Sequence, residues 1–432
     1  MCSAQWRQPN TGSPGRRSGL EQSTANRQSP ARPVRRICST VTTGGWSDRV
    51  ASLVRRSVAP IVRRHERRLP TDAGRRRVLH AVNRLGDKGD GISNVCVDLA
   101  CQQSMEGDHV MVATNVGGFT DLVGDFGVDV VEVDFSSRSV AVLVRTTVRF
   151  RRLVREFTPC IVHAHTMVAT VIARIAVAGT GTKVVATVHN EYQRGVILMA
   201  AAHRVVGVSS VVAESMRLRG LPRWKIRTVL NGTVGSVRRQ ARDAGLPIDL
   251  LQPALVAVGA VSHRKGADLL VEVALEVARS HGAHTYFAGN IDWDLPRRTA
   301  ANSDVADHVH FLGFQPDPRR LLASATVFVL PSRRDPAPLV LVEAMEAGLP
   351  IVATAVDGVT ELLAGGAAGL LVGPNDPAAL IAAVRHLLDD PAARQELGDA
   401  ALLRSTDLNV RRVSADYRMI YEELRRGRTC AP

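Results

Sequence analysis

The chain of 432 residues is 45% hydrophobic and 22% charged, values typical of a globular protein large enough for two domain-sized cores. Only 4% of the residues are aromatic, which argues against a broad stacking surface for single-stranded nucleic acid. The net charge of +14 lies almost entirely in residues 1–77, where 17 arginines and 4 acids give +13. The other 355 residues carry +1, so no specific nucleic-acid partner is expected, although the arginine-rich segment could bind polyanions in a salt-sensitive way.

The cysteines and the hydrophobic pattern bear on the cellular compartment. Six cysteines are scattered without a Cys-x-x-Cys pair or a metal-binding spacing, which favours a reducing cytosol. No apolar run reaches the length of a membrane span. The N-terminus lacks the hydrophobic segment of a signal peptide, because arginines such as Arg16, Arg17 and Arg27 interrupt it. We therefore expect a cytoplasmic protein.

Residues 1–73 are expected to form a basic N-terminal extension. Residues 1–47 are rich in Ser, Thr, Pro, Gly, Gln and Arg, so they are predicted to be largely disordered, with a transit peptide or a start site assigned too early as alternatives. Residues 48–68 place apolar side chains at near-helical spacing among arginines, a pattern typical of a helix on an anionic membrane surface. Pro60 would kink such a helix. The membrane interpretation implies peripheral contact at the inner face of the membrane, and a helix docked on the body or a solvated tail is the alternative.

From residue 77 onward, short apolar strands alternate with helices. Helices are expected between the strands, for example at 92–103 and 140–157, and the same rhythm restarts at 254–259. Buried strands separated by helices indicate parallel sheets covered on both faces, and two such series predict two Rossmann-like domains with a ligand at the carboxyl ends of their strands. The expected boundaries are 74–245 and 253–410, followed by a final helix in 411–432 that crosses back to the first domain. The first-half strands are predicted at 78–83, 109–113, 128–133, 161–163, 183–188, 204–208 and 226–230.

The most informative stretch is 331–350, which reads as a buried strand, an acid in a turn, a helix and a second acid. Asp335 and Glu343 are eight positions apart, which is about 12 Å if the span were helical. Acids at that separation fit two ends of one elongated ligand rather than a close catalytic pair. The ordinary alternative is that Asp335 caps a helix with Pro336 at its first position and that Glu343 is a surface acid.

This run resembles the signature of family 4 glycosyltransferases, in which two glutamates flank seven residues before a helix that ends in Ala-x-x-x-Gly-x-Pro. Here Asp335 stands within Asp-Pro-x-Pro-Leu-Val at the first acidic position, and Glu343 matches the second. The resemblance implies the GT-B fold and retaining transfer of a sugar from a nucleotide-diphospho-sugar to a hydroxyl of a glycan, glycolipid or small molecule. Asp335 would face the donor sugar and Glu343 the ribose, while amides near Leu339 and Val340 would meet the diphosphate.

A strand-to-helix turn in the second half carries the next resemblance. Residues 258–266 resemble the family's Gly-Arg-Leu-x-x-x-Lys-Gly, with Gly259 at its start and Lys265 as the lysine that neutralises the diphosphate. The family's arginine is replaced by Ala260, and Arg264 or His263 is the candidate substitute. Three further positions match glycine-containing strand ends near the donor base, namely Gly289, Asn290 and Gly313.

The first half offers softer motifs. The loop 85–91 contains Gly86, Gly89 and Gly91 and resembles the family's acceptor-side loop, with a tight strand-to-helix turn as the alternative. His189 follows a strand where the family has a histidine that contacts the donor sugar or shapes the reacting centre. His165, in a His-x-His that begins at residue 163, is expected in the cleft wall rather than as a metal ligand, because no carboxylate or cysteine completes a ligand set nearby.

The resemblance also implies a mechanism. The only Asp-x-Asp, at 292–294, is misplaced for a diphosphate-bound metal, so catalysis without a metal or cofactor is expected, with Lys265 and helix-end amides in the metal's place. No nucleophile is evident, in agreement with a front-face reaction in which the leaving phosphate helps to deprotonate the acceptor. His189, Asp335 and Lys265 are the expected catalytic residues. The alternative is a non-catalytic nucleotide-sugar-binding or scaffold protein, which Ala260 and the aspartate at 335 favour.

Overall fold

The computed structural model describes residues 75–86, 91–115, 117–137, 139–240 and 247–425. The chain divides into two compact units, Met1–His65 and Glu66–Pro432, and all described residues belong to the second. The predicted extension 1–73, its helix at 48–68 and Gly89 therefore lie outside the described residues.

The first of two sheets has seven parallel strands in the order β3-β2-β1-β4-β5-β6-β7. Every residue of the central strand at 161–164 is buried, and so is every residue of the neighbouring strand at 183–188 after Lys183, as expected for strands covered on both faces. The strands are β1 (Arg77–Arg84), β2 (His109–Asn115), β3 (Asp129–Glu132), β4 (Ile161–Ala164), β5 (Lys183–Val188), β6 (Arg204–Gly207) and β7 (Ile226–Thr228).

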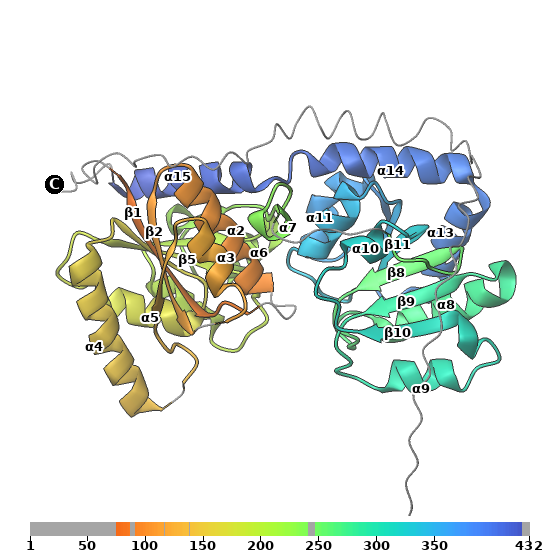
Figure 1. Ribbon diagram of the computed structural model, residues 1–432, viewed down its shortest axis with the longest axis horizontal. Helices are drawn as coiled ribbons and strands as arrows, with labels where there is room; N and C mark the ends of the chain where they lie inside the picture. Colours follow the sequence, from red (N-terminus) through yellow and green to blue (C-terminus); the bar gives the residue numbers. More distant parts are fainter. Residues whose placement is uncertain (1–74, 87–90, 116, 138, 241–246, 426–432) are drawn as a thin grey trace, which may run out of the picture. The chain divides into compact units, whose positions relative to one another are not determined.

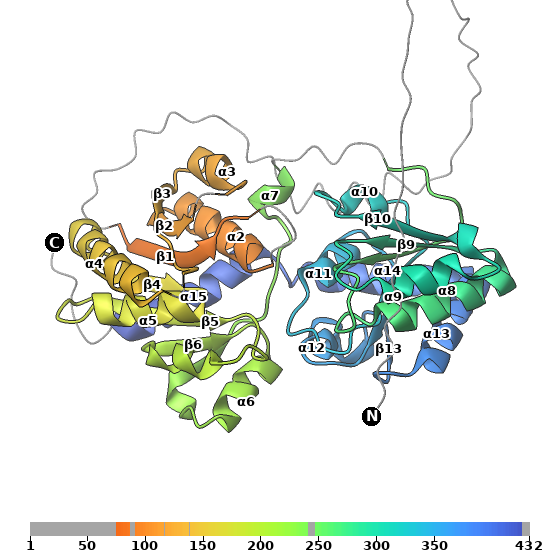
Figure 2. The ribbon, with the colours of Figure 1, turned by 90° about the horizontal axis from the view of Figure 1, so that it is seen from below.

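Helices cover both faces of this first sheet. On one face α4 and α5 lie side by side (Figures 1 and 2) and pack with Leu79 and Ala81 of β1 in one apolar cluster. Val78 and Val82 point to the opposite face, which α2 covers. The α-helices are α2 (Gly91–Met105), α3 (Thr120–Asp125), α4 (Val140–Phe157), α5 (Met167–Ala176), α6 (Ser210–Leu218) and α7 (Val237–Gln240), with short 3₁₀ helices η1 (Val196–Ala201) and η2 (Arg223–Lys225).

The second sheet has six parallel strands in the order β10-β9-β8-β11-β12-β13. These are β8 (Ala254–Val258), β9 (His284–Ala288), β10 (Val309–Gly313), β11 (Val327–Leu330), β12 (Ile351–Thr354) and β13 (Leu370–Val372). Its helices are α8 (Ala267–His281), α9 (Leu295–Ala301), α10 (Arg319–Leu322), α11 (Leu339–Glu346), α12 (Val359–Leu362), α13 (Pro377–Asp389) and α14 (Pro391–Ser405), with 3₁₀ helices η3 (Ala306–His308) and η4 (Ala364–Gly366). The prediction of two doubly wound parallel sheets is confirmed, and the predicted strand ends either match the observed ends or differ from them by at most two residues.

The last helix, α15 (Val410–Arg425), packs on the first sheet although it follows the second in the chain. Its Tyr417, Ile420 and Tyr421 are buried beside Val78 of β1 and Leu99 of α2. Each of the two buried tyrosines contributes a large apolar ring and a hydroxyl that needs a hydrogen-bond partner. The contact between α15 and the first sheet is therefore both apolar and polar. None of the described helices combines the length and apolar character that a bilayer-crossing segment requires.

Candidate active site

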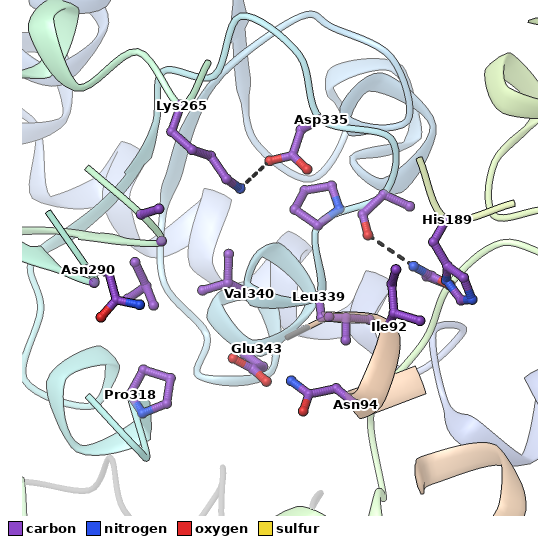
Figure 3. Close-up of a pocket in the computed structure, with 18 of the residues that line it drawn as sticks. Ile92, Asn94, His189, Lys265, Asn290, Pro318, Asp335, Leu339, Val340 and Glu343 are labelled. Atoms are coloured by element: carbon purple, nitrogen blue, oxygen red, sulfur yellow. Dashed lines mark hydrogen bonds and ion pairs between the residues drawn. The ribbon is translucent and has the colours of Figure 1, made fainter. Parts of the chain in front are cut away.

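A cavity of about 470 Å³ lies where strands of both sheets end (Figure 3). Ligands of doubly wound sheets bind in such places, because the turns after the strands leave backbone groups and side chains free. Most of the predicted site residues line this cavity. They are Gly91, His189, Gly259, Arg264, Lys265, Gly289, Asn290, Asp335, Leu339, Val340 and Glu343.

Three predicted residues with described positions do not line the cavity. Gly86 follows β1, and its N–H donates to Ser93 Oγ of α2 at 3.2 Å. Gly313 ends β10 with a φ of 67°, and its neighbours Phe314 and Gln315 line the cavity instead. His165 is buried behind His189, with its Nδ1 3.2 Å from Nε2 of His189.

Lys265 and Asp335 form an ion pair in the cavity wall, with Nζ 2.5 Å from Oδ2 (Figure 3). The Asp335 side chain is only 8% exposed, so this contact is shielded from water and stronger than a surface pair. Ser332 Oγ donates to the same Oδ2 at 3.3 Å, and the Asp335 N–H donates to Asp357 Oδ2 at 2.6 Å. The carboxylate is thus held in one orientation, with Lys265 as its counter-ion.

Helix α11 opens directly onto the cavity. It begins at Leu339 after Pro338, no side chain caps it, and its first turn contains no acid. Asp335 is therefore not the helix cap that the ordinary alternative required. The N–H groups of Leu339 and Val340 have no intrahelical partner, so this helix end is suited to an anion. Glu343, one turn further along, also lines the cavity.

Two glycines allow the backbone to approach itself closely around the cavity. A Cβ on Gly289 would lie 1.9 Å from the carbonyl oxygen of Gly259. Gly266 has a φ of +68°, and a Cβ there would lie 1.9 Å from the carbonyl oxygen of Pro331. Any side chain at either position would push the turn that carries Lys265 away from its neighbours.

The cations around the cavity are arranged differently from the family pattern. Ala260 lines the cavity and supplies no charge. Arg264, the candidate substitute, lines it too and donates from Nη1 to the carbonyl oxygen of Arg334 at 3.0 Å. Arg238 of α7 is a cavity residue that sequence reasoning missed, because no motif surrounds it. It is nine-tenths buried and binds Asp98 through Nε at 2.7 Å and Nη2 at 2.8 Å.

His189 belongs to a buried group of histidines below the cavity. Burial lowers the pKa of His80 and of His189 to about 4 and holds the pKa of His163 and His165 well below the usual range. All four rings are therefore neutral near pH 7. The expectation that no cysteine completes a ligand set near His165 is wrong, because Cys96 of α2 lies close to this histidine in the fold. One ligand atom each from His80, Cys96 and His165 lie within 4.8 Å of one another.

Comparisons with known proteins agree with this architecture. A family profile described as "Glycosyltransferase Family 4" matches residues 89–234, and one described as "Glycosyl transferases group 1" matches residues 252–390. The chain is 30% identical over 277 residues to a D-inositol 3-phosphate glycosyltransferase of Acidothermus cellulolyticus, a match that covers 55% of this chain and 61% of the relative. It is 34% identical over 181 residues to a glycogen synthase of Mycobacterium tuberculosis, with coverage of 40% and 43%. The chain thus spans less than two thirds of the length of these relatives.

Solved structures extend the fold comparison to most of the chain. A glycosyltransferase from Rickettsia africae has a TM-score of 0.69 at 15% identity, covering 81% of this chain and 99% of that one. Anabaena HepE, in complex with UDP and glucose, has a TM-score of 0.66 at 17% identity, with coverage of 80% and 99%. Two doubly wound sheets whose strand ends share one cavity define a GT-B protein. The two family profiles together span more than half of the chain, which belongs to the family 4, group 1 glycosyltransferases.

Proposed function

We propose that this chain transfers a sugar, with retention, from a nucleotide-diphospho-sugar to an acceptor hydroxyl. The observation that carries the proposal is that Lys265, Asp335, Glu343 and the open end of α11 all face one cavity. This arrangement offers a cation and free amides for a diphosphate, and carboxylates on either side for hydroxyl groups. Residues 74–245 would bind the acceptor, residues 253–410 would bind the donor, and residues 411–432 would return to the acceptor side.

Each part of the donor has a proposed partner. The diphosphate would lie between Lys265 and the amides of Leu339 and Val340, which stabilise the charge that develops on the leaving group. Glu343 would accept hydrogen bonds from the ribose hydroxyls, and Asp335 from the transferred sugar. Gly289 and Asn290, which also line the cavity, would lie near the base.

The chemical step would need no metal or cofactor of its own. Lys265 Nζ lies 2.5 Å from Asp335 Oδ2, so binding of the diphosphate would place the ammonium between two anionic groups. The departing phosphate would take the proton of the acceptor hydroxyl on the same face of the sugar, which preserves the anomeric configuration. Gly91, at the start of α2, and His189 would border the acceptor side.

A donor screen tests this proposal. Thermal shift with UDP-, GDP-, ADP- and dTDP-sugars should identify one donor, with UDP-glucose tried first because HepE was solved with UDP and glucose. Nucleoside diphosphate release should then follow on addition of a lipid-linked or soluble acceptor, and turnover should be unaffected by EDTA. Loss of turnover in EDTA that Mg²⁺ or Mn²⁺ restores would contradict the metal-independent step.

The second candidate is a nucleotide-sugar-binding protein without transferase activity. Ala260 favours it, because the cavity lacks a cation at the position where the family has arginine. Donor binding without nucleoside diphosphate release, for every acceptor tried, would support this candidate. A cytoplasmic location, with peripheral contact at the inner face of the membrane, is proposed for either function.

A further inference from the structure

Four histidines from neighbouring strands meet below the cavity. His80 lies in β1 and pairs in register with His163 of β4, while His165 and His189 follow β4 and β5. The rings are close, with centroids 4.3 Å apart for His163 and His165 and 5.4 Å apart for His165 and His189. So dense a group of titratable rings beside a candidate active site requires a definite arrangement of protons.

A single line of hydrogen bonds leads from α2 to the cavity. Gln103 Oε1 lies 3.0 Å from His80 Nε2, and His80 Nδ1 lies 3.1 Å from His165 Nε2. His165 Nδ1 in turn lies 3.2 Å from His189 Nε2. Gln103, His80 and His165 are buried, so water cannot replace any of these partners without a structural change.

The orientation of Gln103 sets the direction of this line. Its amide nitrogen donates to the Tyr421 hydroxyl at 3.3 Å, which leaves its oxygen to accept from His80 Nε2–H. A neutral imidazole has one N–H and one bare nitrogen. His80 Nδ1 is therefore bare and accepts from His165 Nε2–H, and His165 Nδ1 accepts from His189 Nε2–H by the same reasoning.

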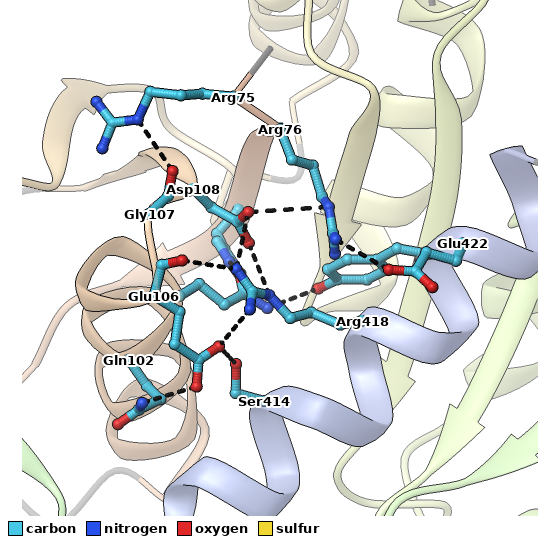
Figure 4. Close-up of polar contacts among 12 residues, drawn as sticks. Arg75, Arg76, Gln102, Glu106, Gly107, Asp108, Ser414, Arg418 and Glu422 are labelled. Atoms are coloured by element: carbon cyan, nitrogen blue, oxygen red, sulfur yellow. Dashed lines mark hydrogen bonds and ion pairs between the residues drawn. The ribbon is translucent and has the colours of Figure 1, made fainter. Parts of the chain in front are cut away.

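Tyr421 belongs to α15, and the contacts of this helix hold its hydroxyl in place. Its hydroxyl also lies 2.7 Å from His163 Nδ1. The helix is clamped to the first sheet by Arg418, which reaches Glu106 and Asp108 at 3.1 Å, and by the Ser414 hydroxyl, which donates to Glu106 at 2.7 Å (Figure 4). Gln103, at the end of the hydrogen-bonded line away from the cavity, is thus anchored by α15. This helix follows the whole second sheet in the chain.

We propose that Gln103, His80 and His165 are positioning residues that hold His189 in one neutral tautomer, with a bare Nδ1 for a hydroxyl of the bound sugar. Among the described residues, Nδ1 of His189 has no hydrogen-bond partner, and the ring lines the cavity. A bare nitrogen accepts a hydrogen bond but repels a phosphate oxygen. Anionic groups of the ligand therefore bind at Lys265 and α11, and a hydroxyl binds at His189. This inference rests on the proposed function for the identity of its ligand.

The tautomer is measured without any activity. Protein labelled with ¹⁵N-histidine, with His189 assigned by its loss in His189→Gln, should show the Nε2–H tautomer at pH 7. Gln103→Met removes the acceptor at the far end and should leave His189 as a mixture of tautomers. His165→Leu should do the same, whereas His165→Asn should restore the Nε2–H form, because its amide oxygen stands where Nδ1 accepts. Gln102→Met, a neighbouring buried position whose side chain bonds Glu106 instead, should leave the tautomer unchanged.

Deoxy-sugar donors supply the functional readout. One analogue should lack the hydroxyl that donates a hydrogen bond to His189 Nδ1. It should bind wild type about tenfold more weakly than the parent donor does. The same analogue should bind His189→Phe no more weakly than the parent donor binds that variant, because phenylalanine offers no acceptor. Gln103→Met should raise KM for the parent donor more than it lowers kcat, at a thermal stability similar to that of Gln102→Met.

Three results would overturn the proposal. The first is that His189 is cationic, or carries its proton on Nδ1, at pH 7. The second is that Gln103→Met leaves the tautomer of His189 unchanged. The third is that the purified protein binds one equivalent of metal through His80, Cys96 and His165. The Nε2–H tautomer in a protein that turns over no donor would instead refute the proposed function and leave the positioning role standing.

Discussion

Lys265 and Asp335 are 70 positions apart in the chain, yet their charged atoms lie 2.5 Å apart, in the loops that follow β8 and β11. The two strands are hydrogen-bonded neighbours in the second sheet, so their following turns end at the same place. The pair therefore follows from strand order, and it lies beside the open end of α11. Four predictions follow from this site and from the buried groups around it.

Lys265→Met should abolish most of the turnover, by a factor on the order of 10² to 10³, because the developing charge on the diphosphate loses its cation. Lys265→Arg should retain part of the activity, since a guanidinium preserves the charge. Steady-state rates with the identified donor measure both. Lys183→Met is the matched control, because Lys183 begins β5 at the end opposite the cavity. Wild-type rates in Lys265→Met would remove Lys265 from the proposed mechanism.

Glu343→Gln should raise KM for the donor about tenfold and change kcat little, because ribose contacts are made equally in the ground and transition states. The effect should vanish with a donor that lacks both ribose hydroxyls. Isothermal titration with the nucleoside diphosphate and its dideoxy analogue measures this difference. Glu396→Gln, on the exposed surface of α14, serves as the control. Equal losses with both ligands would contradict a ribose contact.

Acid should destabilise the protein through its buried histidines. The pKa of His80 falls from 6.5 to about 4 on folding because of burial, so the unfolded chain binds the proton more tightly. The full stability is present above pH 6.5 and is lost as the pH falls toward 4. For His80 alone the loss at pH 4.5 should be on the order of 2 kcal/mol.

Urea unfolding at pH 7 and pH 4.5 measures this loss, and His80→Gln should show a smaller difference between the two pH values than wild type. His386→Gln, on α13 of the second sheet, should not reduce it. A pH dependence equal in wild type and His80→Gln would mean that His80 keeps an ordinary pKa.

Gly289→Ala should reduce both stability and donor affinity, because its Cβ would lie 1.9 Å from a backbone oxygen that cannot rotate away. Gly373→Ala is the control, since no atom lies within 4 Å of its added Cβ and its backbone is unstrained. Thermal unfolding and donor titration should separate the two variants clearly. An unchanged melting temperature for Gly289→Ala would show that the turns after β8 and β9 are more adaptable than the structure indicates.

Local pattern determined most of the architecture. Continuous apolar runs of strand length separated by amphipathic helices predicted both parallel sheets, and glycines after strands predicted the turns that carry Lys265 and Asn290. The acids Asp335 and Glu343 were also recognisable from their own neighbours in the chain. These features depend on the period of the backbone and on short-range turn chemistry, which a sequence carries directly.

Which side chains of neighbouring strands and helices meet could be learned only from the tertiary structure. His80 and His165 are 85 positions apart, and they meet because β1 lies between β2 and β4 in the sheet. Packing of α2 on β1 brings Cys96 to them, and packing of α7 on α2 brings Arg238 to Asp98. Strand order and the packing of helices across a sheet depend on which distant surfaces bury one another, and no periodic pattern within a segment encodes that choice.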